Sequence, residues 1–292
     1  MTPDVYPPLR SLLFCPATEP RRLAKLPTLG ADAVAIDLED AVSNARKSSA
    51  REDARSALDL LDGVRAYVRV NNPSTGRTQD DIEGVVSRNL DGIVLPKVDD
   101  AETVRLADSW LREAEEREGV AVGSTRLLVL LESALGIHNA AEILAASPRV
   151  ETAIFGFVDF MLDVGIDTID HTPGAEELSY ARSAIIIAAR VARRSAPLDG
   201  PFIDIKAPEL FEAQCRQARS FGFRGKMLIH PSQIPLSHSG FGPSEEEVAA
   251  AHRVIDQFAA VEAAGGAAVV VDGRLVDYPV VHRAQRIIAA AR

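Results

Sequence analysis

Short apolar runs alternate with longer amphipathic segments along most of the chain. Each run is rich in Val, Ile, Leu and Ala, as buried strands are, and a segment with helical spacing of apolar residues follows it. The predicted strands cover residues 9–14, 33–37, 65–70, 92–95, 127–131, 152–155, 202–205 and 226–229. Eight strand–helix units without a linker predict an α/β fold of the (β/α)8 TIM barrel type, and the length of 292 residues agrees. A doubly wound open sheet is the alternative, but it usually has fewer strands, and no GxGxxG motif follows the first strand.

The last part of the chain has a different pattern. A capping box that starts at Ser244 predicts a helix that ends near residue 264. Asp272-Gly273 between two short apolar runs predicts a β-hairpin, and a final helix follows it. We therefore expect a catalytic barrel domain over residues 1–264 and a C-terminal extension, a hairpin plus a helix, over residues 265–292.

Two carboxylates stand just past the ends of neighbouring predicted strands. Glu132 follows the fifth strand directly, and Asp159 follows the sixth strand after a short turn. (β/α)8 barrels hold their catalytic residues at the carboxyl ends of the strands, so these two side chains should lie near each other. Together they could bind one hard divalent cation, and oxygen ligands favour Mg²⁺ over Zn²⁺. The alternative is that Glu132 is an acid at a helix N-terminus and Asp159 a solvated loop acid.

Other charged residues at the same strand ends add anion-binding and acid–base groups. Arg69 can bind a carboxylate through two NH groups at once, so a metal with Arg69 beside it predicts a chelated oxyacid as substrate. Asp37, Glu39 and Asp40 come at the end of the second strand, and Lys97 follows the fourth. The alternative for these acids is that they pair with Arg69 or Lys97 in an internal salt bridge.

Composition and charge exclude several classes of protein. The formal net charge of −10 argues against nucleic acid or an anionic membrane as the main partner, although small anionic substrates stay open. Cys15 and Cys215 are too far apart in sequence to suggest a disulfide framework, so a reducing cytoplasm is the simpler location. We expect no signal peptide in the first ten residues, and the most apolar segment, 184–189, is too short for a bilayer. Without HExxH or CxxC, a zinc site has no support.

Several segments together match a known family. The sequence resembles the citrate lyase β-subunit-like (CitE-like) CoA-ester lyases of the HpcH/HpaI aldolase superfamily. The matching segments are RSLLFCPA (10–17), DAVAIDLEDAV (32–42), VRVNN (68–72), GIVLPKV (92–98), LLESALGIHNAAEI (130–143), FGFVDF (155–160), GKMLIHPSQI (225–234) and DGRLVDYPVVHRA (272–284). They cover nearly the whole chain in the family's order, and they are specific for the family but not for one substrate.

The resemblance implies a (β/α)8 barrel with a C-terminal extension that packs on a neighbouring subunit, in homotrimers or dimers of trimers. It implies Mg²⁺ held by Glu132 and Asp159. It also implies that Arg69 clamps the substrate's carboxylate or enolate, and that Asp277 acts as a catalytic acid/base in the active site of a neighbouring subunit. Many relatives have an acidic residue before the metal-binding aspartate, where this chain has Val158. We expect the metal site to survive this difference, with altered hydrogen bonding in its loop.

The implied reaction is reversible carbon–carbon cleavage of a 3-hydroxyacyl-CoA that carries a carboxylate. Malyl-CoA or citramalyl-CoA would give acetyl-CoA and a 2-oxo acid. Glu39 is a further candidate for the catalytic set, and Lys97 and Arg10 are candidates for binding the substrate or its CoA. Three alternatives stay open: a β subunit acting on a citryl-carrier protein in a citrate lyase complex, a malyl-CoA thioesterase, and a non-catalytic protein that binds CoA or an oxyacid.

Overall fold

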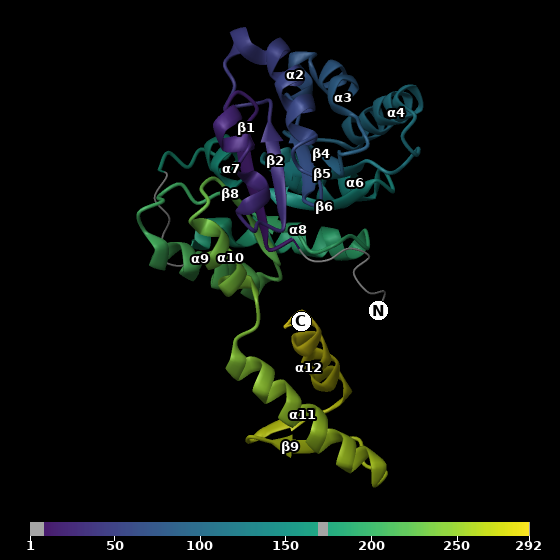
Figure 1. Cartoon of the computed structure of the whole chain (residues 1–292). Helices are drawn as coiled ribbons and strands as arrows, with labels where there is room; N and C mark the ends of the chain where they lie inside the picture. Colours follow the sequence, from purple (N-terminus) through teal and green to yellow (C-terminus); the bar gives the residue numbers. More distant parts are fainter. Residues whose placement is uncertain (1–8, 169–174, 292) are drawn as a thin grey trace. The chain divides into compact units, whose positions relative to one another are not determined.

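Eight parallel strands form a closed barrel in sequence order in the computed structural model, which describes residues 9–168 and 175–291 (Figure 1). The strands are β1 (Ser11–Pro16), β2 (Ala33–Asp37), β3 (Arg65–Arg69), β4 (Gly92–Leu95), β5 (Arg126–Leu131), β6 (Val150–Phe155), β7 (Leu198–Asp199) and β8 (Gly225–Leu228). The predicted TIM barrel is therefore confirmed. The first residues, where we expect no signal peptide, lie largely outside the described part of the chain.

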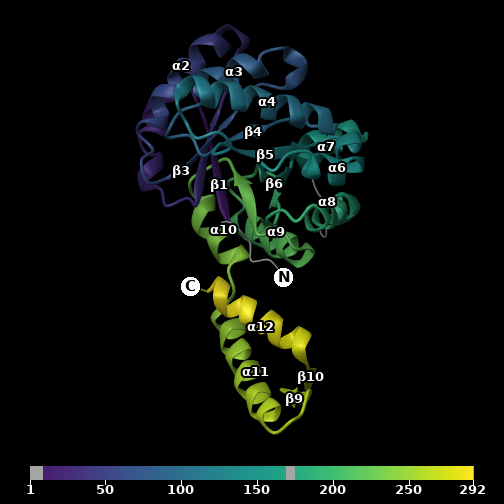
Figure 2. The ribbon, with the colours of Figure 1, turned by 90° about the vertical axis from the view of Figure 1, so that its right-hand side faces the viewer.

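Helices follow the strands and lie around the outside of the barrel (Figure 2). They are α1 (Pro20–Leu23), α2 (Lys47–Leu58), α3 (Thr78–Val85), α4 (Ala101–Glu118), α5 (Ala134–His138), α6 (Ala140–Ala145), α7 (Phe157–Asp163), α8 (Ser179–Val191), α9 (Pro208–Phe221) and α10 (Gln233–Phe241). Short 3-10 turns occur at Leu26–Thr28, Asn44–Arg46, Pro73–Thr75 and Glu176–Leu178. Across the described residues, no helix combines the length and the apolar character that crossing a membrane requires.

Alternate residues of the strands share one face and form the central apolar core. This spacing follows from the two-residue repeat of a strand, which sends successive side chains to opposite faces. The core cluster is Leu9, Leu12, Phe14, Ala33, Ala35, Tyr67, Val94, Leu128, Leu130, Ile154, Leu198 and Met227. Gly92 makes room for the largest of these, because a Cβ atom there would lie 2.8 Å from the ring of Tyr67.

The seventh strand is shorter and lies earlier in the chain than its prediction. β7 consists of Leu198 and Asp199, and the prediction of a strand over residues 202–205 is wrong, since that segment is irregular. Pro201 explains the early end, because proline has no N–H group with which to continue the hydrogen bonding of a sheet. β7 pairs with β6 only between Ile154 and Leu198.

Residues Ser239–Arg292 form a second compact unit, separate from the unit Met1–His238. It contains α11 (Glu245–Ala263), β9 (Val269–Val271), β10 (Arg274–Val276) and α12 (Tyr278–Ala290). The unit begins earlier than the predicted boundary after residue 264, because α11 packs on α12 and β9. That this extension packs on a neighbouring subunit remains a prediction.

The second unit confirms the predicted hairpin and helix. β9 and β10 are antiparallel, and Asp272 and Gly273 have φ angles of +48° and +74°, as a two-residue hairpin turn requires. The capping box at Ser244 is present: the N–H of Glu247 donates to Ser244 Oγ at 3.1 Å, and the Ser244 N–H donates to Glu247 Oε2 at 2.8 Å. Val271 and Val276 are buried against Phe258.

Gly225 opens β8 where the strand meets the chain just before β1. A Cβ atom on Gly225 would lie 1.7 Å from the carbonyl oxygen of Leu9. We expect Gly225→Ala to lower the free energy of unfolding by about 3 kcal/mol, because the backbone of a closed barrel cannot move aside. Urea denaturation followed by circular dichroism measures this change.

Gly84→Ala is the matched control for this experiment. A Cβ atom there meets only the flexible side chain of Arg51, at 3.4 Å, and Gly84 lies within α3. Its substitution should leave stability unchanged or raise it by up to about 1 kcal/mol. Similar losses for the two variants would contradict the tight packing inferred for Gly225.

Candidate active site

The carboxyl ends of the strands bring most of the predicted site residues together. Asp37 ends β2, Arg69 ends β3, and Glu132 directly follows β5. These ends meet at the same rim of the barrel, because its strands are parallel. The predicted site residues found there are Glu39, Arg69, Lys97, Glu132 and Asp159.

Arg69 is held by Asp37 through two parallel hydrogen bonds. Arg69 Nε donates to Asp37 Oδ1 and Arg69 Nη2 donates to Oδ2, both at 2.7 Å. The other edge of the guanidinium, Nη1, lies 3.2 Å from Glu39 Oε2 and 3.3 Å from Asp40 Oδ2. The salt bridge that we considered as an alternative is therefore present, and Nη1 is the edge that Arg69 turns toward Glu39 and Asp40.

The charge on Arg69 is secure in this setting. Burial disfavours the charged guanidinium, but the hydrogen bonds and charge of Asp37, together with Glu39 and Asp40, outweigh it and raise the pKa of Arg69. Asp37 also accepts the backbone N–H groups of Glu39 at 2.9 Å and Ala41 at 3.2 Å. One carboxylate thus fixes both the guanidinium and the start of the turn that follows β2.

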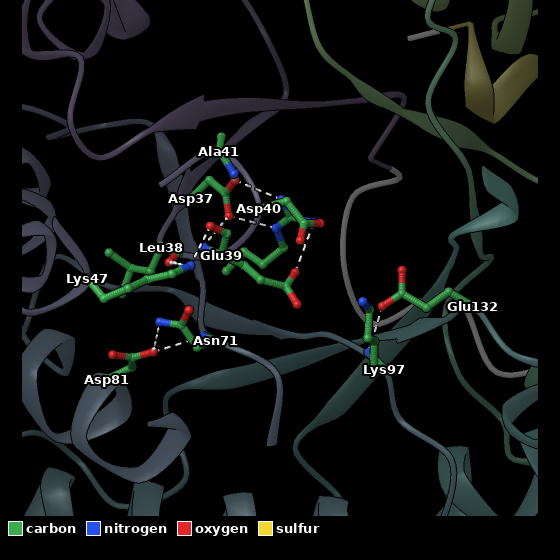
Figure 3. Close-up of polar contacts among 11 residues, drawn as sticks. Asp37, Leu38, Glu39, Asp40, Ala41, Lys47, Asn71, Asp81, Lys97 and Glu132 are labelled. Carbon is green, nitrogen blue, oxygen red and sulfur yellow. Dashed lines mark hydrogen bonds and ion pairs between the residues drawn. The ribbon is translucent and has the colours of Figure 1, made fainter. Parts of the chain in front are cut away.

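Lys47 also holds the turn that follows β2, a role that the sequence analysis did not predict. Its Nζ donates to the carbonyl oxygens of Leu38 at 2.9 Å and Glu39 at 2.6 Å, as Figure 3 shows. Burial lowers the pKa of Lys47. A signal was present in the sequence: a lysine at the first residue of a helix opposes the helix dipole unless its side chain is used elsewhere.

Glu39 is a buried carboxyl group without a complete set of partners. Its Oε2 atom makes no hydrogen bond, although Arg69 Nη1 lies near it in an unsuitable orientation. Burial raises the pKa of Glu39 to about 7; the charges of Asp40 and Asp37 add to the rise, and Arg69 opposes it. A carboxyl group with such a pKa can exchange a proton near neutral pH.

Lys97 lies between the two predicted metal ligands. Its backbone N–H donates to Glu132 Oε1 at 2.7 Å, and its Nζ lies 3.6 Å from Asp159 Oδ1 (Figure 3 shows the contact with Glu132). Lys97 has a φ of +49°, a left-handed conformation that few residues other than glycine adopt. Asp159 does not lie in a loop but in the first turn of α7. The positive end of the helix dipole favours a carboxylate at this position.

Glu132 is buried close to other acids, and a glycine gives it room. Burial raises the pKa of Glu132 to about 8, and the charges of Asp159 and Glu39 add to the rise. Gly156 caps α7 directly beside it: a Cβ atom there would lie 2.6 Å from Glu132 Oε2. The carboxylate can therefore approach the start of α7 only because residue 156 is glycine.

These residues fit a magnesium ion better than a zinc ion. Among the described residues, no group of three or more His, Cys, Asp or Glu side chains is arranged to hold a metal. Mg²⁺ often takes only one or two carboxylates and completes its shell with water and substrate oxygens. Glu132 and Asp159 offer such a pair, and a bound cation would relieve the repulsion that contributes to the raised pKa of Glu132.

Arg10 is not brought to this end of the barrel. It precedes β1, at the amino end of that strand, and it pairs with Asp32: Nη2 lies 3.1 Å from Asp32 Oδ1, and the backbone N–H donates to Oδ2 at 2.7 Å. His238 lies 3.5 Å from the same carboxylate. A residue just before a parallel strand lies opposite its carboxyl end, so Arg10 does not join the other predicted residues.

Asp277 belongs to the second unit and caps α12. Its Oδ1 accepts the backbone N–H of Val280 at 3.4 Å. This contact gives Asp277 a structural role as a helix cap, which agrees with the proline that follows it in the first turn of α12. The catalytic role of Asp277 stays a prediction.

Comparisons with known proteins agree on one family. The family model that matches residues 10–231 is described as HpcH/HpaI aldolase/citrate lyase. Citrate lyase subunit beta of Leuconostoc mesenteroides subsp. cremoris is 35% identical over 284 residues, which cover 97% of this chain and 93% of the relative. L-malyl-CoA/beta-methylmalyl-CoA lyase of Cereibacter sphaeroides is 34% identical over 304 residues, covering 97% and 95%.

A solved structure is similar over almost the same length. It is the protein CitE from Mycobacterium tuberculosis in complex with magnesium, acetoacetate and coenzyme A. The TM-score is 0.80 at 30% sequence identity, and the match covers 96% of this chain and 97% of that chain.

The raised pKa of Glu39 predicts a pH-dependent effect on stability. Because the pKa rises from 4.5 to about 7 on folding, Glu39 stabilises the fold fully below pH 4.5, and this contribution is lost as the pH rises through 7. In EDTA, Glu39→Gln should therefore raise the free energy of unfolding by about 2 kcal/mol at pH 8 and change it little at pH 5. Urea denaturation at both pH values measures the difference.

Glu116→Gln, on the exposed face of α4, is the control, and it should not reproduce the gain in stability that Glu39→Gln shows at pH 8. An equal effect of Glu39→Gln at pH 5 and pH 8 would mean that the buried carboxyl group titrates as it does in the unfolded chain.

Proposed function

Since the chain belongs to the HpcH/HpaI aldolase/citrate lyase family, we propose that it is a Mg²⁺-dependent CoA-ester lyase. The reaction is reversible cleavage of a carbon–carbon bond in a 3-hydroxyacyl-CoA that carries a carboxylate. With malyl-CoA or citramalyl-CoA, the products are acetyl-CoA and a 2-oxo acid. The observation that supports this most is the pair Glu132 and Asp159, joined by Lys97, at the same rim as Arg69.

Glu132 and Asp159 would hold the metal ion. When bound, Mg²⁺ would polarise the substrate's carboxylate and hydroxyl and lower the pKa of that hydroxyl. Glu132, with a pKa of about 8 in the metal-free chain, must give up any proton it carries to act as a ligand. A relative, CitE of Mycobacterium tuberculosis, has been solved with magnesium, acetoacetate and coenzyme A, which supports a metal ion and a coenzyme A moiety as ligands of this chain.

Arg69 and Glu39 would act on the bond that breaks. Arg69 Nη1 is suited to stabilise the oxyanion of the acyl-CoA enolate, because Asp37 already fixes the rest of the guanidinium. Glu39, with a pKa of about 7, is suited to take the hydroxyl proton as the carbon–carbon bond breaks. Lys97, whose Nζ lies beside Asp159, would contact the anionic part of the substrate.

Asp277 would complete the site from a neighbouring subunit, in a homotrimer or a dimer of trimers. In the cleavage direction it protonates the enolate carbon, and in the condensation direction it deprotonates acetyl-CoA. Electrons from the broken bond pass to the thioester enolate and then to the new carbon–hydrogen bond, so the step needs no redox partner.

Mass spectrometry of the products tests the proposal directly. The purified protein is incubated with malyl-CoA, citramalyl-CoA and citryl-CoA, each with Mg²⁺ and with EDTA. Acetyl-CoA plus one 2-oxo acid, formed only with Mg²⁺, supports the lyase and identifies its substrate. Free CoA with an intact hydroxy acid indicates a thioesterase instead. No turnover of any ester contradicts a stand-alone lyase and favours a carrier-protein complex or a binding protein.

Removing either metal ligand should abolish both metal binding and turnover. We expect Glu132→Gln and Asp159→Asn to weaken Mn²⁺ binding by more than about 100-fold, since each takes away one of two carboxylates. Mn²⁺ takes the place of Mg²⁺ in this experiment, because electron paramagnetic resonance of the free ion measures binding without substrate. Asp163→Asn is the control, because Asp163 is an exposed acid of the same helix that accepts the N–H of Ala134. Near-normal binding by Glu132→Gln would remove it from the site.

Asp277→Asn separates catalysis from structure. Asparagine caps helices about as well as aspartate, so α12 should keep its start and the protein its stability. The loss of the acid should still lower kcat by about 100- to 10,000-fold while Mn²⁺ binding is retained. Steady-state kinetics and thermal unfolding measure the two effects. Normal kcat would show that Asp277 is only a helix cap.

A further inference from the structure

Three fully buried charged side chains lie together outside the apolar centre of the barrel. They are Asp199 at the end of β7, Lys226 in β8 and Arg182 in α8, each with an exposed fraction of 0%. Arg182 donates to both Asp199 oxygens, at 3.2 and 3.1 Å, and Lys226 Nζ donates to Asp199 Oδ2 at 2.6 Å. Two cations therefore share one anion.

This arrangement has one more cation than neutrality requires. Although burial opposes ionisation, Lys226 and Arg182 keep the pKa of Asp199 below its usual range. A buried charge without a matching partner costs several kcal/mol, so a single arginine or lysine would satisfy Asp199 with less penalty. Neutralising the charge of Asp199 therefore does not explain why both Arg182 and Lys226 are present.

Lys226 has a further contact that leads toward the candidate metal site. Its Nζ lies 5.4 Å from the centroid of the Phe157 ring, the geometry of a cation–π interaction. Arg182, in contrast, lies over the ring of Phe221 at 6.0 Å. Phe157 is the first residue of α7, and Asp159 is in the same turn.

The Phe157 ring is held on other sides as well. It meets the Phe155 ring edge to face, with centroids 5.9 Å apart. A Cβ atom on Gly200 would lie 2.5 Å from it, so Gly200 leaves room for the ring. On the other side of the peptide, Gly156 lies against Glu132. The Phe157 ring, at the first turn of α7, is thus packed among Phe155, Gly200 and Lys226.

We propose that Lys226 is a positioning residue for the metal site. Its ammonium group, held by Asp199, lies against Phe157 and fixes the first turn of α7, and this orients Asp159 relative to Glu132. Arg182 has a different task, which is to bind α8 to β7 through Asp199. The inference rests on the proposed metal site at Glu132 and Asp159.

A matched pair of variants tests this assignment. Lys226→Met and Arg182→Met each remove one cation and leave Asp199 with the other, so the two variants make the same change in buried charge. Only Lys226→Met removes the contact with Phe157. We expect it to weaken Mn²⁺ binding, measured by electron paramagnetic resonance without substrate, by roughly 10-fold, and Arg182→Met to change it by less than about 2-fold.

A third variant keeps the charged residues intact. Phe157→Leu should weaken Mn²⁺ binding to a similar extent, and combining it with Lys226→Met should add little, because both changes break the same contact. At saturating Mn²⁺, kcat of Phe157→Leu and of Lys226→Met should stay within about 3-fold of kcat of the original protein. Both changes affect how Asp159 is positioned to bind the metal ion, so they lower the affinity for Mn²⁺.

The outcomes separate the inference from the proposed function. If the unaltered protein binds no Mn²⁺, the metal site itself is wrong. If it binds Mn²⁺ and Lys226→Met binds equally well, or if Arg182→Met loses as much affinity, the positioning role is overturned. The same holds if Phe157→Leu binds Mn²⁺ normally, which decides the question even if Lys226→Met fails to fold.

Discussion

The paired hydrogen bonds between Arg69 and Asp37 are the interaction on which the candidate active site depends. They join the ends of β2 and β3 and leave Nη1 of the guanidinium directed toward Glu39 and Asp40. Asp37 also accepts two backbone N–H groups of the turn, so the anion, the cation and the loop form one unit. Breaking a buried pair of this kind typically costs about 3–5 kcal/mol, which keeps the guanidinium in one orientation.

The architecture was predictable from the sequence because a parallel barrel repeats one simple pattern. Buried strands such as 127–131 are continuous apolar runs, and the acids that follow them stand out against that background. The direction of a strand then gives the side of the barrel, which placed Glu132 and Arg69 correctly at one rim. The same rule should have excluded Arg10, which comes before its strand.

Features that depend on contacts between distant segments could not be read in this way. β7 contains two residues, too few for any periodicity, and an apolar run beyond Pro201 was a more convincing strand than the real one. Asp199 and Lys226 are 27 positions apart, and nothing in either sequence context indicates that they meet. Lys47 was similarly hidden, because its partners are carbonyl groups and backbone atoms leave no trace in the pattern of side chains.

Because β7 is short, few backbone hydrogen bonds hold the barrel wall together between β6 and β8. Between β6 and β8 the backbone ladder is short, so side chains replace it: Arg182 and Lys226 tie three elements together through Asp199. Proteins open locally where the fewest backbone hydrogen bonds must break. This part of the wall borders α7, which carries Asp159, so local opening there would also move this proposed metal ligand. A cation held at Glu132 and Asp159 would then lower the population of the locally opened barrel. The wall between β6 and β8 would therefore resist opening most when the metal ion is bound.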